Sequence, residues 1–171
     1  MTPRILLIVG TLILANQAAA ACVASDPVAT ARWIYANQVN FPTYQFPQDM
    51  RLMKSFISPR LLALLEVEWP CQVVSEGPCA VDTDPWTNAK NGKALEPTAF
   101  SVGSYTGSRS TVRVTFRLAS DDGDSPRPFR AQARLMLVRD AKSGCWLLDD
   151  LVGMKGMSLV KQLQSYAALY P

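Results

Sequence analysis

The chain contains no histidine, so its polar residues have to work without an imidazole. The serines therefore cannot form a Ser–His or Cys–His nucleophile system. A zinc site is not expected either, because the four cysteines lack paired C-x-x-C spacing. Residues 121–124 contain three aspartates but lack the later ligands and the closing glutamate of a calcium loop. We expect no metal, no other cofactor and no catalytic residue.

Three aspartates remain as candidates for binding or acid–base chemistry. Asp84 stands in Asp84-Pro85-Trp86, which either presents a carboxylate and an indole to a ligand or, as we favour, braces a turn and packs on the core. Asp149 and Asp150 are neighbours on an expected strand, so their side chains point to opposite faces. One of them can face the interior, where burial raises a carboxyl pKa and suits a general base. Pairing with an arginine of the sheet, or capping of a turn, is the alternative that we favour.

Four arginines form the second group of candidates. Arg113 and Arg117 share one face of a strand expected over 111–118, and Arg130 and Arg134 share one face of the return strand. If the register aligns them, the sheet carries a basic patch suited to a carboxylate, a phosphate or an acidic protein surface. An ordinary solvated face is the simpler alternative.

The elements that position these residues change from helical to strand-like along the chain. Asp26-Pro27 begins a helix that ends near Asn37, and Ser58 caps a stronger helix that ends before Pro70. The other expected elements are a short helix over 48–56, a long loop over 71–98, strands from 99, over 111–118, 129–139 and 145–152, and a helix capped by Ser158. This order predicts an α+β fold: a curved antiparallel sheet with the N-terminal helices packed on its concave face, and a C-terminal helix.

The clean alternation over 111–118 predicts which side chains enter the core. Val112, Val114, Phe116 and Leu118 are expected to be buried, while the two arginines and Thr115 between them face solvent or a cleft. A slip of one residue would exchange the two sets.

Residues 1–20 have the features of a signal peptide. Basic Arg4 precedes an apolar run over 5–14, too short to span a membrane, and small residues over 18–21 form a cleavage site. We therefore expect an exported protein, periplasmic or secreted, in which residues 21–171 form a single domain. A lipoprotein anchored through Cys22 is the alternative, and a membrane is expected as a partner only in that case. The formal net charge is only +3, and cleavage of the signal peptide removes Arg4 from it. Because this positive charge is small, nucleic acid is not an expected partner.

The four cysteines make an even set in an oxidising compartment. Cys71 and Cys79 are close in sequence, and Gly77-Pro78 between them turns the chain back, so we expect a disulfide there. Cys22 then pairs with Cys145 by elimination, unless Cys22 is acylated and leaves Cys145 as a buried thiol.

Four short motifs resemble the domain-of-unknown-function family 3828. They are Ile57-Ser58-Pro59-Arg60-Leu61-Leu62, Asp84-Pro85-Trp86-Thr87-Asn88-Ala89, Trp146-Leu147-Leu148-Asp149-Asp150-Leu151 and Ser158-Leu159. The resemblance implies an exported bacterial protein or lipoprotein with a fold similar to the nuclear-transport-factor-2-like cone. Lys90-Asn91 stands where family members often have Gln-Asp, and the family has no established catalytic residue to transfer.

These features favour a non-catalytic exported binding module, whose cone holds a small apolar or anionic ligand or whose sheet face docks a protein partner. The residues expected to bind are Asp84, Trp86, Arg113, Arg117, Arg134 and Asp150. An inhibitor or immunity protein against a secreted toxin is the first alternative, since the domain is small, disulfide-braced and has a long loop. The second is an isomerase- or dehydratase-type enzyme that uses an interior aspartate with a tyrosine as hydrogen-bond donor.

Overall fold

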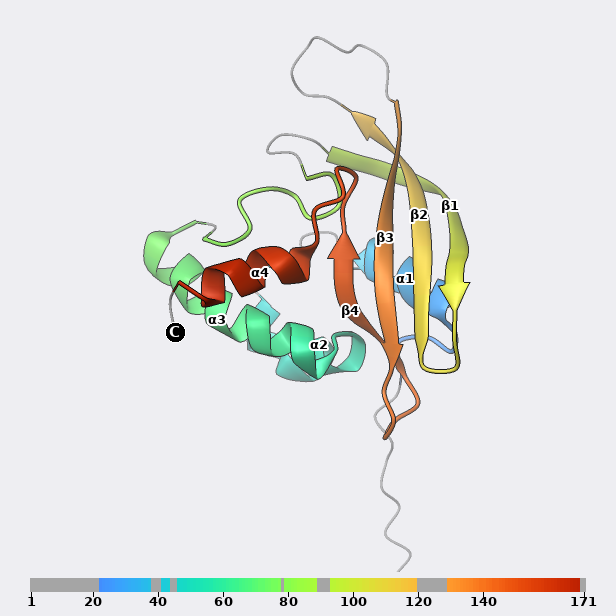
Figure 1. The fold of residues 1–171 in the computed structure, drawn as a ribbon, viewed down its shortest axis with the longest axis horizontal. Helices are drawn as coiled ribbons and strands as arrows, with labels where there is room; N and C mark the ends of the chain where they lie inside the picture. Colours follow the sequence, from blue (N-terminus) through green and yellow to red (C-terminus); the bar gives the residue numbers. More distant parts are fainter. Residues whose placement is uncertain are drawn as a thin grey trace, which may run out of the picture.

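The computed structural model describes residues 22–37, 41–43, 46–77, 79–88, 93–119 and 129–169. These residues form an α+β fold with four α-helices and one four-stranded antiparallel sheet (Figure 1). The helices are α1 (Pro27–Asn37), α2 (Met50–Phe56), α3 (Pro59–Ser75) and α4 (Leu159–Ala167), with a short 3-10 helix (Phe46–Asp49) before α2. The strands are β1 (Lys93–Tyr105), β2 (Arg109–Ala119), β3 (Phe129–Arg139) and β4 (Trp146–Val152). The expected signal peptide and the aspartates of 121–124 lie outside the described residues.

Three helices begin at the caps that the sequence predicts. The Asp26 carboxylate accepts a hydrogen bond from the backbone N–H of Ala29 at 2.9 Å, at the start of α1. The hydroxyls of Ser58 and Ser158 accept from the third backbone N–H beyond them, at 3.2 and 3.1 Å, at the starts of α3 and α4. Each cap satisfies an N–H group that the helix itself leaves without a partner.

Helix α3 does not end before Pro70, so that prediction was wrong. Pro70 lies inside the helix on its exposed side, where its missing N–H removes one helical hydrogen bond. Burial of the neighbouring Trp69 and Gln72 holds the next turn in place, and the helix ends only at Ser75, before Glu76, whose φ of 53° is left-handed. The additional turn brings Cys71 to the side of the loop that contains Cys79.

Strand β1 begins within the segment that we expected to be a loop. The sheet order is β1-β2-β3-β4, and β1 starts at Lys93 rather than near residue 99. Its pairing with β2 shifts register on both sides of Pro97. These irregularities interrupt the two-residue period, which hides the strand from a search for alternating side chains.

The register of β2 and β3 confirms the predicted core face. Val112, Val114 and Phe116 are fully buried and Leu118 is 4% exposed. The side chains that alternate with them, at 113 and 117, are exposed, and Thr115 is half-buried. The inner face of β3 is buried in the same way through Ala131, Ala133, Leu135 and Leu137.

The helices occupy two places relative to the sheet. α1 lies against the inner face, where Ile34 is fully buried and Tyr35 contacts the Trp86 ring edge-on, with centroids 4.9 Å apart. α2, α3 and α4 lie together beside β4 (Figure 1). The sheet is neither closed nor strongly curled. Of the N-terminal helices that we expected on its concave face, α1 covers the inner face, whereas α2 and α3 lie beside β4. The outer face of β2 and β3 is open. None of the helices described here is long and apolar enough to cross a membrane.

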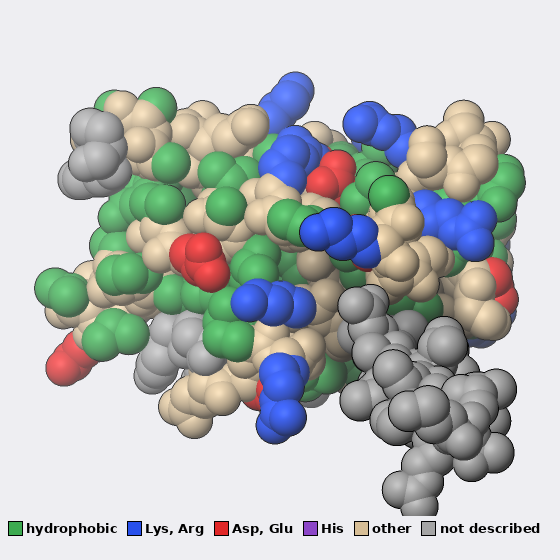
Figure 2. Space-filling model, turned by 90° about the horizontal axis from the view of Figure 1, so that it is seen from below, with side chains coloured by type: hydrophobic (Ala, Val, Ile, Leu, Met, Phe, Trp, Pro, Cys, Tyr) green, Lys and Arg blue, Asp and Glu red, His purple; other side chains and the backbone are tan. Residues whose placement is uncertain are grey.

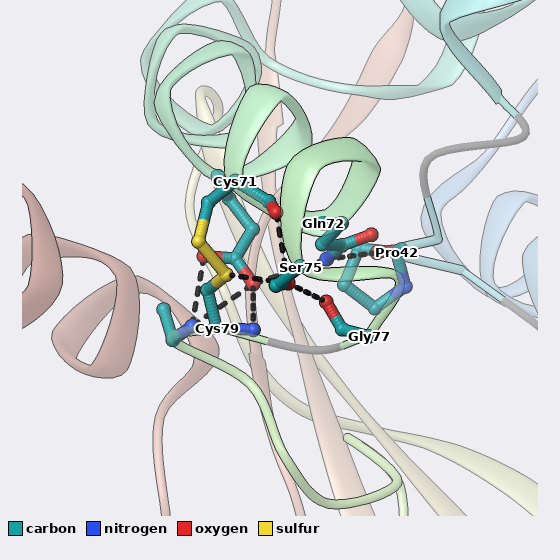
Figure 3. Close-up of a disulfide and its surroundings, with 8 residues drawn as sticks. Pro42, Cys71, Gln72, Ser75, Gly77 and Cys79 are labelled. Carbon is teal, nitrogen blue, oxygen red and sulfur yellow. Dashed lines mark hydrogen bonds between the residues drawn. A yellow bond between two sulfur atoms is a disulfide. The ribbon is translucent and has the colours of Figure 1, made fainter.

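Both predicted disulfides are confirmed. Cys71 and Cys79 are bonded with their Cα atoms 6.2 Å apart (Figure 3), and Cys22 and Cys145 with theirs 5.2 Å apart. The first fastens the end of α3 to the following loop, and the second fastens the start of the described chain to the beginning of β4. Two disulfides indicate an oxidising, extracytoplasmic location.

Candidate functional site

Asp84 and Trp86 belong to a turn and to the core. The Asp84 carboxylate accepts from the backbone N–H groups of Trp86 at 3.0 Å and Thr87 at 2.7 Å. Burial raises the pKa of Asp84, and hydrogen bonds from Thr87 and Trp86 oppose this rise only in part. Trp86 is fully buried, so its indole offers no surface to a ligand.

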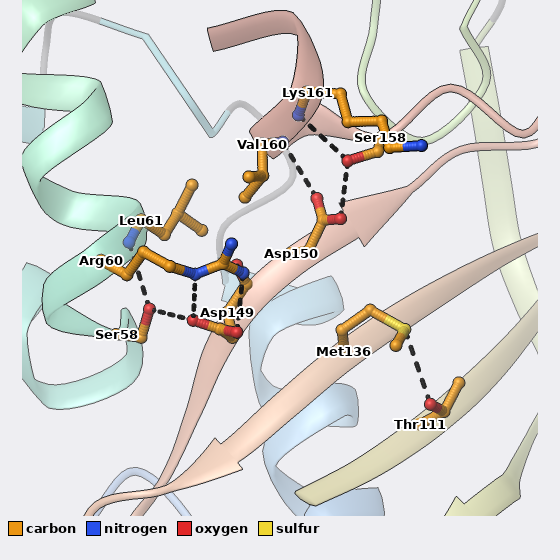
Figure 4. A network of polar contacts seen from close by, with 10 residues as sticks. All are labelled: Ser58, Arg60, Leu61, Thr111, Met136, Asp149, Asp150, Ser158, Val160 and Lys161. Carbon is orange, nitrogen blue, oxygen red and sulfur yellow. Dashed lines mark hydrogen bonds and ion pairs between the residues drawn. The ribbon is translucent and has the colours of Figure 1, made fainter. Parts of the chain in front are cut away.

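Asp149 holds the start of α3 against β4. Its carboxylate accepts from the Ser58 hydroxyl at 2.7 Å and from Nε and Nη2 of Arg60 at 3.1 and 2.7 Å (Figure 4). Burial alone would raise the pKa of Asp149, but the hydrogen bonds from Arg60 and Ser58 and the charges of Arg60 and Arg109 outweigh it and lower the pKa. The expected arginine partners on the sheet are thus replaced by Arg60 of the helix.

Asp150 holds the start of α4 in the same manner. One carboxylate oxygen accepts from the Ser158 hydroxyl at 2.7 Å, and the other accepts from the backbone N–H of Val160 at 3.0 Å (Figure 4). A register shift between Met136 and Leu137 of β3 lies opposite the two aspartates. This irregularity lets neighbouring aspartates each reach the beginning of a different helix.

The open outer face of the sheet brings the four candidate arginines together. Arg113 lies directly opposite Arg134, and Arg117 lies directly opposite Arg130. All four are exposed, and the one ion pair among the described residues joins Arg60 to Asp149 instead. Like charges in directly opposed positions of an antiparallel pair repel each other. The outer face of the sheet therefore carries two pairs of directly opposed arginines, which we call the basic rungs, and their positive charge faces solvent.

The rungs between these arginines are neutral and polar. Thr115 pairs with Gln132 between the two basic rungs, and Thr111 pairs with Met136 on the far side of Arg113. The Thr111 hydroxyl donates to the Met136 sulfur at 3.5 Å (Figure 4). A thioether is a weak acceptor, so this hydroxyl retains most of its capacity for another hydrogen bond.

A groove of about 350 Å³ continues this face beside β4. Arg109, which shares the face of Arg113 four residues before it, lines the groove together with Arg60, Thr111, Met136 and Asp149. Figure 2 views the molecule from below, and Lys and Arg side chains are spread over the middle and right of that face while acidic groups are isolated. The lining of the groove also includes Asp150, and Arg60 is paired with Asp149, so its two arginines and two aspartates nearly balance. Arg109 is the side chain through which the groove can contact an anion.

A second cavity, of about 260 Å³, lies beside the Cys22–Cys145 disulfide. Its lining includes Ile57, Leu62 and Leu147, with Lys54 as its cation. Apart from Lys54 and Asp140 this lining is mainly apolar or uncharged, so the cavity suits a small apolar ligand.

Two residues of this site were not among the predicted ones. Arg109 follows the same four-residue spacing as Arg113 and Arg117, so an extension of that pattern by one step identifies it. Arg60 carries no such signal, because its partner Asp149 is 89 residues away in the chain. The described residues contain no group of three side chains suited to a metal ion. No protein-family model, curated protein or solved structure matches the chain.

Proposed function

We propose that this protein is a non-catalytic exported binding module that holds an anionic partner on the open outer face of its sheet. The observation that carries this proposal is the direct opposition of Arg113 with Arg134 and of Arg117 with Arg130. Each guanidinium presents a planar set of donors that matches a carboxylate or a phosphate. An anion placed between two opposed guanidiniums removes their mutual repulsion.

The roles of the candidate carboxylates support a function without catalysis. Asp84 braces a turn, Asp149 binds Ser58 and Arg60, and Asp150 caps α4. Each carboxylate already accepts hydrogen bonds that its neighbourhood needs for folding. A general base would have to give up such partners before it could take a proton from a substrate.

The disulfides support the soluble form of the exported protein. Acylation would use the sulfur of Cys22, which is bonded to Cys145 instead. The α+β order, with α1 against one face of the sheet, is compatible with a nuclear-transport-factor-2-like fold and with membership of family 3828. We propose both assignments, with the chain representing an open variant of the cone, since the sheet is not strongly curled.

Binding of the disulfide-intact mature protein to immobilised poly-L-glutamate tests the proposed function. The variant Arg113→Ala/Arg134→Ala should bind at least about tenfold more weakly than the wild type at low salt, a loss of about 1.4 kcal/mol. The control Arg51→Ala/Lys161→Ala removes the same charge from the exposed surfaces of α2 and α4. Equal losses in the two variants would show that only net charge matters and would reject the sheet face as the binding surface.

A further inference from the structure

Three arginines form a regular row along the outer face of β2, which we call the arginine ladder. Arg109, Arg113 and Arg117 follow one another at four-residue spacing on the same face of β2. A strand rises about 3.4 Å per residue, so neighbouring arginines are about 14 Å apart and the ladder is about 27 Å long. A ladder of this length matches an extended polymer with repeated negative charges better than a single small anion.

The positions between the basic rungs indicate what kind of polymer fits. Thr115 and Gln132 are paired between the two arginine pairs, so the centre of this face is polar. The centre of a typical protein–protein interface is apolar instead. Gln132 is exposed, and its amide can both donate and accept. Hydroxyl groups between charged groups, as on a chain of sugar rings, can donate to and accept from the Gln132 amide.

The groove at the end of the ladder offers similar chemistry. Arg109 supplies positive charge, while Arg60 is paired with Asp149 and Asp150 is a second carboxylate of the lining. Ser104, Thr106 and Thr111 contribute hydroxyl-bearing residues. Met136, 37% exposed, adds one small apolar surface. Hydroxyls and a limited apolar surface suit a sugar ring, whose acidic group would lie toward Arg109 and away from the two aspartates.

We propose that the anionic partner is a linear glycan whose sugar units carry carboxylate or phosphate groups, lying along β2 with one unit in the groove. This inference rests on the proposed function, because it uses the same arginine face. The described centre of this face is polar and charged, so it offers no apolar contact for the anchoring side chain of a protein partner. Among the described residues of this face, an anionic membrane would meet no cluster of apolar side chains to insert between the arginines.

The test compares polymers of similar charge on the disulfide-intact protein. The probes are oligogalacturonate, phosphorylated dextran, neutral dextran, poly-L-glutamate and phosphatidylglycerol vesicles. We expect at least one acidic glycan to bind more tightly than poly-L-glutamate and the vesicles, and neutral dextran not to bind. Comparison of oligogalacturonate with phosphorylated dextran identifies the preferred acidic group. Tighter binding of poly-L-glutamate or of the vesicles than of both acidic glycans would overturn the glycan assignment.

A variant that retains every charge separates sugar recognition from charge alone. Thr111→Val/Gln132→Ala should weaken binding of the preferred acidic glycan by about fivefold or more through lost hydrogen bonds, and leave binding of poly-L-glutamate unchanged. Equal glycan affinity in this variant and the wild type would contradict the glycan proposal. If poly-L-glutamate binding still depends on Arg113 and Arg134, the proposed function survives that result. If no polyanion depends on these arginines, both proposals fail.

Discussion

Replacement of Glu68 by alanine should remove a fully buried carboxylate that ties α3 to the loop beside the Cys71–Cys79 disulfide. Glu68 accepts from the side-chain amide of Gln72 at 3.0 Å and from the backbone N–H groups of Cys79 at 3.2 Å and Ala80 at 2.8 Å. The variant leaves the two backbone N–H groups without this acceptor, whereas the Gln72 amide still donates to the Pro42 carbonyl at 3.4 Å. Each unsatisfied buried donor costs about 1–3 kcal/mol, while removal of the buried charge returns part of that free energy. We therefore expect the free energy of unfolding to fall by about 3 kcal/mol.

Urea unfolding followed by tryptophan fluorescence, with both disulfides intact, measures this loss. For a urea dependence of about 1–3 kcal/mol per molar, the unfolding midpoint should fall by about 1–3 M. Glu68→Gln, which keeps one acceptor oxygen, should lose less. The control Glu66→Ala changes an exposed carboxylate on the same helix and should stay within about 0.5 kcal/mol of the wild type. A Glu68→Ala variant as stable as the Glu66→Ala control would refute the account of this network.

The remaining predictions concern the disulfides and Asp149. The Cys22–Cys145 bond joins residues separated by 123 positions and the Cys71–Cys79 bond joins residues separated by 8, so the chain-entropy model assigns them about 5 and about 2.6 kcal/mol. In urea unfolding, Cys22→Ala/Cys145→Ala should therefore lose more free energy of unfolding than Cys71→Ala/Cys79→Ala. The opposite order would contradict the role of loop length. Because the folded-state pKa of Asp149 is lowered, its stabilisation is present above the ordinary carboxyl pKa and is lost as pH falls through the folded-state value. Asp149→Asn should reduce the acid-side loss of stability in unfolding midpoints measured between about pH 3 and pH 7, and an unchanged acid limb would argue against the Arg60–Asp149 interaction.

Local patterns explain why much of the fold could be predicted from the sequence. The alternation of Val112, Val114 and Phe116 determines the core face of β2, because a strand has only two faces. Ser58 and Ser158 mark helix starts, because the hydroxyl and the N–H groups that it caps are local. The direct opposition of Arg113 and Arg134 required the strand register, which the sequence indicates only as one possibility.

The predictions that failed depend on interactions that a local pattern does not contain. Pro70 is tolerated in α3 because Trp69 and Gln72 beside it are buried by distant parts of the chain. The early start of β1 is concealed by register shifts at Pro97. The pairing of Asp149 with Arg60 depends on how α3 packs beside β4, so residue spacing cannot reveal it.

The central claim is that the arginines of the open sheet face bind the anionic partner. Titration of the isotope-labelled protein with oligogalacturonate, followed through the arginine Nε–H resonances, tests it most directly. The account predicts that the resonances of Arg113, Arg117, Arg130 and Arg134 shift together and saturate at one ligand concentration, while that of Arg51 on α2 does not move. Shifts confined to Arg51 or to other residues away from this face, with the four sheet arginines unchanged, would contradict it.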